Sequence, residues 1–313
     1  MPASSIDRDD LVAHTADPWP LPAHGDTVEL WRRLADLGER DLPLAKLVEP
    51  HHDAVAILAD LGSTTTAPGD VWAVWAAEPP FAVVEAENAP GGWTLTGRKA
   101  FCSGAELVSR ALVTARTPDG SRLFAIELPA DGVTVDASSP SWSGAGMARA
   151  RTVTLALDHV PATPVGAAGA YTDRAGFWWG AIGVAAIWLG GARGVARVLE
   201  DAQARLDAHG RAHLGGVRAD LVSLELAFDA ASVLADEAKL ETSEVERLAL
   251  VLRARTSAVV ESVVSRVGRA TGPGPLAFDA EHAARVADLQ VFVRQDHAER
   301  DLESLGSMER LDD

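Results

Sequence analysis

In the C-terminal half of the chain, apolar residues repeat at the spacing of a helix over two long stretches, and this pattern most constrains the fold. One stripe runs from Leu214 to Leu234 and the next from Val245 to Val267. Residues three and four positions apart lie on one side of a helix, so a stripe of this kind marks the side that faces a core. Both stretches are therefore predicted to be long amphipathic helices.

The ends of these helices are also marked in the sequence. Ser243 and Glu246 have the spacing of a capping box, which predicts a helix start, and the glycines and prolines of residues 271–275 predict its end. A further helical repeat follows from Asp279 to Leu305. Together with the apolar segment described next, these helices predict an antiparallel four-helix bundle over residues 169–313.

The segment from Ala175 to Ala192 contains 18 residues without a charge, which reaches the lower limit for a membrane span. Arg174 and Arg193 flank it closely, and the helical repeat continues with one apolar side as far as Leu206. A helix that is apolar all round and then one-sided is typical of the central member of a bundle or of a subunit interface. We therefore expect no membrane span.

The middle of the chain changes to the alternating pattern of half-buried strands. Apolar and polar residues alternate over residues 93–96 and again over residues 152–157. Between these segments, residues 111–116 and 122–128 flank a Pro-Asp-Gly turn, which predicts a hairpin. The region 70–168 is therefore predicted to be an antiparallel sheet or small barrel.

Helical spacing also occurs near the start of the chain, over residues 28–37 and 51–61. Gly38 and Gly62 follow these segments, and we expect each helix to end at its glycine. Two short helices are thus predicted within an N-terminal segment, residues 1–69. The predicted fold class is α+β, with a short helical part, an antiparallel β layer and a C-terminal four-helix bundle.

Charge and cysteine content limit the partners and the compartment. The formal net charge of −17 disfavours a nucleic-acid partner, because phosphate groups would be repelled over most of the surface. Cys102 is the only cysteine, so no disulfide can form within the chain. The first ten residues lack the apolar core of a secretion signal. We therefore expect a cytoplasmic protein.

Several common catalytic and cofactor motifs are absent from the sequence. Its glycine-rich segments lack the strand, turn and helix order of a dinucleotide-binding fingerprint. The adjacent His51 and His52 point in different directions, and His209 and His213 have no third ligand at a suitable spacing. We therefore expect no metal site.

Two segments of the predicted β layer resemble the acyl-CoA dehydrogenase family. Residues 92–105 (GWTLTGRKAFCSGA) are similar to a strand reading W-x-L-x-G-x-K that leads to an aromatic residue and a serine or threonine. Residues 146–162 are similar to the family's Gly-Met turn and the strand after it, which ends in Asp-x-Val and a proline. With similar helices at 190–202 and 284–306, the resemblance covers residues 28–306.

The resemblance implies a flavoprotein. Members of this family bind FAD between a β domain and a helical bundle and remove an α proton and a β hydride from an acyl-CoA thioester; flavin monooxygenases use the same fold. By this resemblance Phe101, Cys102 and Ser103 form the cofactor-binding segment, with Phe101 stacked on the flavin and Ser103 at its polar edge. The Cys102 side chain is expected to face away, because neighbouring strand residues alternate in direction.

The same resemblance indicates where a catalytic base would lie. In the family a glutamate often follows an Arg-Asp pair by eight residues; here Asp288 lacks the arginine, and eight residues later stands Asp296. On a continuous helix Asp296 would share a side with Leu289 and Val293, partly out of water, which raises the pKa of a carboxyl group. His297 is the neighbouring candidate. The alternative is a solvated helix end with salt bridges and no catalytic role.

Other features depart from the family. The N-terminal helical part is shorter than usual, and residues 211–215 (RAHLG) replace an Arg and a Phe-Gly that reach the FAD of a neighbouring subunit. Three functions follow: FAD-dependent dehydrogenation of an acyl-CoA-type thioester, a non-catalytic subunit of a heteromeric dehydrogenase, or a flavin-dependent monooxygenase. The apolar run over residues 177–189 predicts a homodimer or a heteromer with a related subunit.

Overall fold

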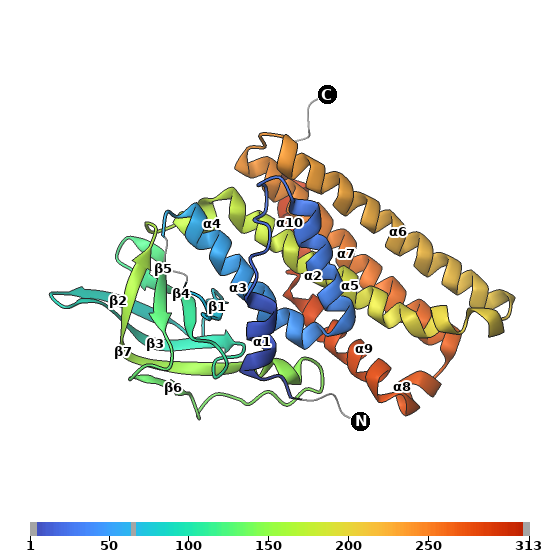
Figure 1. Cartoon of the computed structure of the whole chain (residues 1–313), viewed down its shortest axis with the longest axis horizontal. Coiled ribbons are helices and arrows are strands. Elements are labelled where there is room, and N and C mark those ends of the chain that lie inside the picture. Colours follow the sequence, from blue (N-terminus) through green and yellow to red (C-terminus); the bar gives the residue numbers. More distant parts are fainter. Residues whose placement is uncertain (1–4, 64–66, 309–313) are drawn as a thin grey trace.

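The computed structural model describes residues 5–63 and 67–308; the first four residues, part of the segment considered above for a secretion signal, lie outside these ranges. The β layer occupies one end of the molecule and the long helices occupy the other, with the helix α3 between them (Figure 1). The predicted α+β class, a β layer followed by a helical bundle, is confirmed.

Three helices, one more than predicted, open the described chain. The prediction that Gly38 ends a helix is wrong, because α2 continues through Gly38, where any side chain would overlap the carbonyl group of Ile187. The helix predicted at 51–61 begins earlier, where the Asp41 carboxylate accepts a hydrogen bond from the Leu44 N–H at 3.0 Å. These helices are α1 (Arg8–Thr15), α2 (Thr27–Arg40) and α3 (Leu42–Asp60).

The β layer is one sheet in which most neighbouring strands run antiparallel. The predicted hairpin is confirmed, since β4 and β5 pair along their whole length. Strand β4 also pairs in parallel with β1 and β2, a direction that alternation cannot predict because it reports only which side is buried. The strands are β1 (Trp72–Trp75), β2 (Val84–Ala89), β3 (Gly92–Cys102), β4 (Arg110–Thr117), β5 (Gly120–Glu127), β6 (Val133–Val135) and β7 (Val153–Val165).

The C-terminal half forms the predicted bundle, and the two apolar stripes of its outer helices are largely buried. The capping box predicted at Ser243 and Glu246 is wrong, because the helix begins earlier, where the Glu241 N–H donates to the Glu244 carboxylate at 2.7 Å. The helices are α4 (Ala170–Asp173), α5 (Ala175–Asp201), α6 (Ala208–Glu237), α7 (Thr242–Thr271), α8 (Gly274–Phe278), α9 (Ala280–Phe292) and α10 (Glu299–Ser307).

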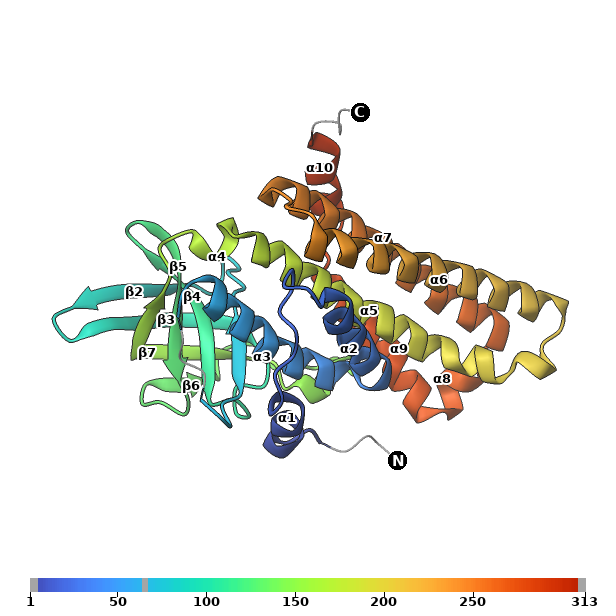
Figure 2. The ribbon, with the colours of Figure 1, turned by 45° about the horizontal axis from the view of Figure 1, so that its top comes forward.

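Helix α5 is the central member of the bundle, as predicted, and packs against α2, α7 and α9 (Figure 2). Among the described residues it is the one helix long and apolar enough to cross a membrane by length and composition, and 78% of that window is buried inside the molecule. No residue from 177 to 189 is exposed. The argument for an oligomer from uncovered apolar surface on this run is therefore wrong, because other helices of the same chain cover it.

The fourth predicted helix, Asp279–Leu305, is interrupted. A 3₁₀ turn and an extended residue, Asp296, separate α9 from α10. The buried Arg253 of α7 donates hydrogen bonds to the carbonyl groups of Gln295, at 2.8 Å, and Ala181, at 3.1 Å. The prediction of one continuous helix is wrong, because a 3₁₀ turn and the extended Asp296 interrupt it where the guanidinium group binds the Gln295 carbonyl, and Asp296 therefore does not lie on a helical side with Leu289.

Candidate functional site

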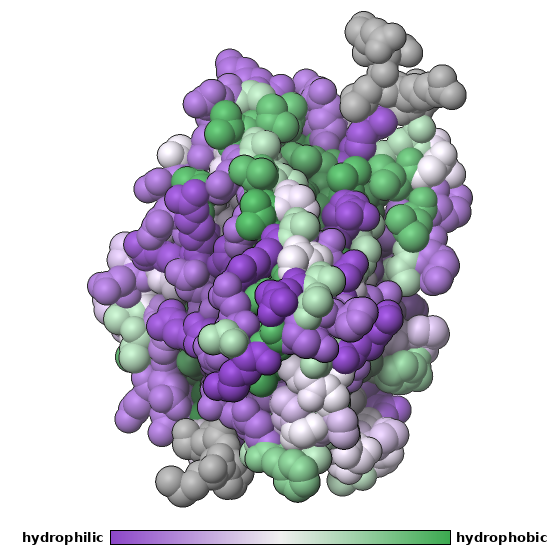
Figure 3. All heavy atoms as spheres, turned by 90° about the vertical axis from the view of Figure 1, so that its right-hand side faces the viewer, coloured by the Kyte–Doolittle hydropathy of each residue, from purple (hydrophilic) through white to green (hydrophobic). Residues whose placement is uncertain are grey.

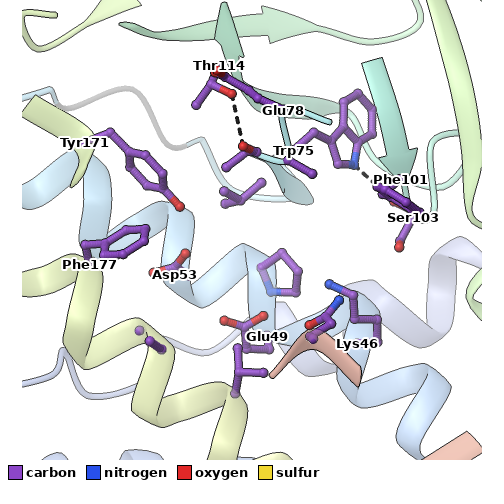
Figure 4. A pocket seen from close by; sticks show the side chains of 18 of the residues that line it. Lys46, Glu49, Asp53, Trp75, Glu78, Phe101, Ser103, Thr114, Tyr171 and Phe177 are labelled. Atoms are coloured by element: carbon purple, nitrogen blue, oxygen red, sulfur yellow. Dashed lines mark hydrogen bonds between the residues drawn. The ribbon is translucent and has the colours of Figure 1, made fainter. Parts of the chain in front are cut away.

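A cavity of about 890 Å³ lies where α3, the β layer and the bundle meet. Figure 4 shows α3 on one side of it and strands on the other, with labelled side chains reaching into the space from both. A volume of this size is typical of sites that take a cofactor or a small organic ligand.

The β side of the cavity carries aromatic rings and hydroxyl groups. Phe101 is 54% exposed, and its backbone has a φ of +59°, in a region that non-glycine residues rarely adopt and that recurs at functional sites. The Ser103 hydroxyl lies 2.9 Å from that of Thr152. The Trp75 indole N–H donates to the Ser103 carbonyl at 3.3 Å, which fixes the strand end. This wall offers an uncovered ring beside a polar pair.

Cys102 does not line the cavity, although it belongs to the predicted cofactor-binding segment. Its side chain faces away from Phe101 and Ser103, as expected from alternation, and is fully buried. The thiol donates to the Lys99 carbonyl at 3.3 Å, and burial raises the pKa of Cys102 to about 12. A thiol with such a pKa stays protonated and unreactive, so Cys102 is a core residue.

The helical side of the cavity carries a row of charged residues on α3. Lys46, Glu49 and Asp53 are three and four positions apart, so they share one side of the helix. The Glu49 side chain is 8% exposed, and no hydrogen bond or salt bridge within the described ranges reaches its carboxyl group. In Figure 4, Glu49 and Asp53 project from α3 toward the open space.

The surroundings of Glu49 and Asp53 favour the neutral, protonated form of each carboxyl group. Burial, with a smaller contribution from Asp53, raises the pKa of Glu49 to about 8, although Lys46 acts in the opposite direction. Burial also raises the pKa of Asp53 to about 6, with Arg174 opposing the rise. Desolvation lowers the pKa of Lys46. The cavity therefore contains two carboxyl groups that exchange protons near neutral pH, as general acids and bases do.

The bundle contributes aromatic side chains opposite these acids. Tyr171 and Phe177 lie edge to face, with ring centroids 5.4 Å apart, and both line the cavity. Gly180 allows α5 to come close to α3, since a Cβ atom at this position would be 2.9 Å from an Asp53 carboxylate oxygen. Arg174 donates to Asp60 at 2.6 Å. The Asp53 end of the cavity is thus an aromatic and acidic corner.

The two predicted base residues occupy different places. Asp296 is partly exposed and does not line the cavity, whereas the neighbouring His297 does. The His297 Nδ1 atom lies 3.1 Å from the Asp301 carboxylate, which orients the imidazole ring. Asp288 accepts a hydrogen bond from the Met147 N–H at 2.5 Å, so it fastens the Gly-Met turn to α9.

Sequence reasoning missed the acids of α3. The helix was predicted to start at residue 51, so Lys46 and Glu49 fell outside it and their shared side with Asp53 was not recognised. The segment contains the cue, because these polar residues interrupt an otherwise apolar helix that is buried along most of its length. Charged residues are rarely buried without a partner, so a charged row on such a helix points to a site.

Comparison with known proteins identifies similar folds but no similar sequence family. No protein-family model matches the sequence, and no curated protein matches it. Solved structures do match, at sequence identities of 20% or less among those described here. At such identities the likeness shows the fold alone. The chain has the acyl-CoA dehydrogenase-like fold.

Three of these structures are informative. KijD3, in complex with FMN and dTDP-3-amino-2,3,6-trideoxy-4-keto-3-methyl-D-glucose, is 18% identical, with a TM-score of 0.74 over 91% of this chain and 81% of that one. TdsC from Paenibacillus sp. A11-2, with FMN and indole, is 19% identical, with a TM-score of 0.75 over 90% and 82%. The nitrososynthase of Micromonospora carbonacea var. africana is 20% identical, with a TM-score of 0.75 over 95% and 86%.

The residues of the cavity fit a flavin ring. An isoalloxazine is flat, with apolar faces and a polar edge, and the β wall presents the uncovered ring of Phe101 beside the Ser103 and Thr152 hydroxyl groups. The cavity offers few cations that are free to bind a phosphate group of the cofactor. Arg174 and Arg294 line the cavity but pair with Asp60 and Glu261, respectively.

Proposed function

We propose that this protein is a flavin-dependent oxidoreductase that acts on a small organic substrate. The observation that carries the proposal is the β wall of the cavity, where Phe101 presents an exposed ring at a strained backbone position beside two hydroxyl groups. Phe101 and Ser103 would hold the flavin, as the sequence predicted, together with Thr152. The substrate would occupy the remaining space toward α3.

We propose FMN as the first cofactor to test, with FAD as the alternative. The related structures of KijD3 and TdsC were solved with FMN. Extended FAD would need further cations for its second phosphate, and two of the arginines that line the cavity are already paired with carboxylates. The segment 211–215 also lacks the residues that reach FAD across a subunit interface in the resembling family.

Of the two candidate reactions, we favour monooxygenation. A bound reduced flavin supplies two electrons, so that one atom of O₂ enters the substrate and the other leaves as water. Dehydrogenation of an acyl thioester instead needs a positioned base for the α proton, and the predicted base Asp296 does not line the cavity. Two of the arginines that line the cavity are paired with carboxylates, which leaves fewer cations for the phosphate groups of an acyl-CoA.

Acyl thioester dehydrogenation is the second candidate, carried by the β segments that resemble the dehydrogenase family and by His297. His297 lines the cavity and is oriented by Asp301, so it could accept a proton in place of a carboxylate. This reaction requires the substrate carbon to approach the α9 end of the cavity. The third hypothesis, a non-catalytic subunit, predicts that no flavin binds.

Flavin titration of the purified protein tests the proposal. We expect FMN or FAD to bind with a perturbed visible spectrum, and Phe101→Ala to weaken that binding about tenfold or more through loss of ring contact. Ser103→Ala should shift the spectrum with little change in fold, since one neutral hydrogen bond is worth about 1 kcal/mol. Phe278→Ala, an equally large truncation at a side chain that is 92% exposed on α8, is the matched control.

The outcomes separate the three hypotheses. Absence of binding by both flavins would refute the oxidoreductase and favour the non-catalytic subunit. Anaerobic bleaching of the bound flavin by an acyl-CoA, abolished in His297→Ala, would select dehydrogenation. Oxygenated product formed from a small substrate with O₂ and a separately supplied reductase would select monooxygenation.

A further inference from the structure

The floor of the cavity contains a buried acid that has no partner. The Glu49 carboxyl group is 8% exposed, projects into the cavity and has no hydrogen bond or salt bridge to any described residue. Asp53 stands one helical turn further along α3 and likewise makes no hydrogen bond or salt bridge to any described residue. Leaving such a group unpaired costs free energy, so its retention points to a ligand that satisfies it.

The nearby cations do not serve as those partners. The Lys46 ammonium group lies 5.8 Å from the centroid of the Phe292 ring and makes no salt bridge with Glu49. Arg174 pairs with Asp60 at 2.6 Å and lies over the Tyr171 ring. Lys46 and Arg174 therefore act on Glu49 and Asp53 only through space, and neither cation makes a hydrogen bond or salt bridge to these two carboxyl groups in the described chain.

The remaining neighbours indicate the kind of cation that would fit. No group of three or more possible metal ligands occurs in the described ranges, so a metal ion at the acid pair would lack a third His, Cys, Asp or Glu ligand there. The rings of Tyr171 and Phe177 line the same corner, and aromatic faces attract organic cations. Burial raises the pKa of Tyr171, so its hydroxyl remains a neutral hydrogen-bond donor.

We propose that Glu49 and Asp53 bind the basic nitrogen of the substrate, which is a primary or secondary amine carried on an apolar or cyclic scaffold. The amine would form charge-assisted hydrogen bonds with the two carboxylates, while its scaffold packs on Tyr171 and Phe177 and extends toward Phe101. As an assignment of substrate class, this inference rests on the proposed function. As an assignment of a binding site, it can be tested alone.

Proton exchange follows from this placement. At a pH near or above 8, where Glu49 is ionised, a substrate ammonium group that enters the site can pass one proton to its carboxylate, giving a neutral amine and a protonated Glu49. The nitrogen then has the free electron pair that any oxidation at nitrogen requires. Burial, which makes Glu49 a stronger base than an exposed glutamate, favours this transfer.

The experiment measures binding of three matched probes to the full chain without added flavin. The probes are 2-phenylethylamine, 2-phenylethanol and 3-phenylpropanoate, which share a ring and a short chain and differ in the charge of the end group. We expect the amine to bind about tenfold or more tightly than the alcohol, and the carboxylate to bind least. Isothermal calorimetry or ligand-observed NMR gives the affinities.

Variants of the acids locate the site. Glu49→Gln and Asp53→Asn should each weaken amine binding about tenfold or more and leave alcohol binding within about twofold. Glu78→Gln is the matched control, because Glu78 lines the β side of the cavity and already accepts a hydrogen bond from Ser121 at 2.7 Å. It should leave the amine affinity within about twofold. Circular dichroism confirms that each variant is folded.

Several results would overturn the inference. These are equal or tighter binding of the alcohol or the carboxylate, no measurable binding of the amine up to about 10 mM, or unchanged amine affinity in both acid variants. Failure of the proposed function looks different, because flavin binding would then be absent while the amine preference and its loss in Glu49→Gln remained. Flavin binding without any amine preference would instead refute only the amine site.

Discussion

A carboxyl group in the cavity keeps its proton at a pH where an exposed glutamate has lost it. Burial raises the pKa of Glu49 to about 8, with Asp53 adding to the rise and Lys46 opposing it. The folded protein therefore holds this proton more tightly than the unfolded chain does. The stabilisation is fully present below the ordinary glutamate pKa and is lost as the pH rises through about 8.

Glu49→Gln should therefore stabilise the protein at alkaline pH. Glutamine keeps the shape of the neutral acid and cannot ionise, so the two proteins should unfold alike near pH 5. At pH 9 the variant should be more stable by roughly 4 to 5 kcal/mol in free energy of unfolding, since the pKa of Glu49 is raised from 4.5 to about 8 and one pKa unit corresponds to about 1.4 kcal/mol. Chemical denaturation of both proteins across this pH range measures the difference.

The control for this prediction is Glu87→Gln, which makes the same chemical change at an exposed position on β2. It should give no gain in stability between pH 5 and 9. A Glu49→Gln variant whose advantage did not grow with pH would show that the acid is solvated or paired in solution. Residues that serve binding often lower the stability of the folded protein. A gain in stability when Glu49 is replaced would therefore agree with a binding role for this acid.

Individual site residues were predicted where they lie on a strand and missed where they lie on a helix. Phe101 and Ser103 follow a motif on one strand, so their neighbourhood was readable from local sequence, and the structure places both at the cavity. Whether they touch a flavin remains a prediction. Asp296 was selected by helical phase, which fails once the helix breaks. Glu49 was missed because the helix was predicted to begin at residue 51; its burial also depends on α5 and the sheet, which are far away in sequence.

At the scale of whole elements, glycine sets how closely α5 and α2 approach. A side chain at Gly190 would overlap the backbone of Ala35 on α2, and neighbouring backbone atoms of Glu39 leave no room to shift. Gly190→Ala should therefore lower the free energy of unfolding by about 3 kcal/mol through overpacking. Urea denaturation with an unchanged slope would attribute the loss to stability.

Gly215→Ala is the matched control for this prediction. Gly215 also lies inside a bundle helix, but no atom lies within 4 Å of a Cβ at that position. There alanine should stabilise the helix by up to about 1 kcal/mol, because glycine is the poorer helix former. If Gly190→Ala were neutral or stabilising as well, α2 and α5 could not lie as close together at Gly190 as the structure places them.

A single buried cation, Arg253, binds at the break between α9 and α10. The Arg253 guanidinium group, which is 7% exposed, bonds to two carbonyl groups and lies 4.8 Å from the centroid of the Trp188 ring. Lysine has one ammonium group and cannot make both bonds while stacking on the ring. Arg253→Lys should cost about 2–3 kcal/mol and increase hydrogen exchange around His297.

The exposed Arg255 on the same helix provides the control, since Arg255→Lys should change neither stability nor exchange. Retention of full protection around residues 293–300 in Arg253→Lys would mean that other contacts hold the break. This element also shows a limit of sequence reasoning. The apolar repeat correctly predicted helices on both sides of the break, but the arginine that binds at the break lies on α7, some forty residues earlier in the chain.

For the molecule as a whole, the formal net charge of −17 opposes self-association, and apolar surface must overcome it. The predicted source of that surface, residues 177–189, is covered by the chain itself. Exposed apolar side chains occur instead on the outer helix α6, where Val222, Leu226 and Val233 stand within about 40° of one another around the helix axis. Figure 3 shows hydrophobic side chains gathered in the upper half of the bundle end of the molecule.

This stripe lies on the side of α6 opposite its core stripe, which Val217, Leu224 and Phe228 bury against the bundle. A helix with two apolar sides needs a neighbour on each, and the described chain supplies only one. We expect a second copy of the chain to cover the outer side, with the two α6 helices packed against each other. The homodimer predicted from the sequence is thus retained as a prediction on a different surface.

The protein should therefore dimerise more strongly as the salt concentration rises, because salt screens the repulsion between two acidic copies and leaves the apolar contact intact. Light scattering coupled to size exclusion, at low salt and near 0.5 M salt, should show the dimer fraction increasing. Leu226→Ser together with Val222→Ser should give a monomer under both conditions, whereas Phe278→Ser, at an exposed apolar residue on α8, should not. A wild-type monomer at every salt concentration, or a dimer unaffected by the α6 substitutions, would contradict this arrangement.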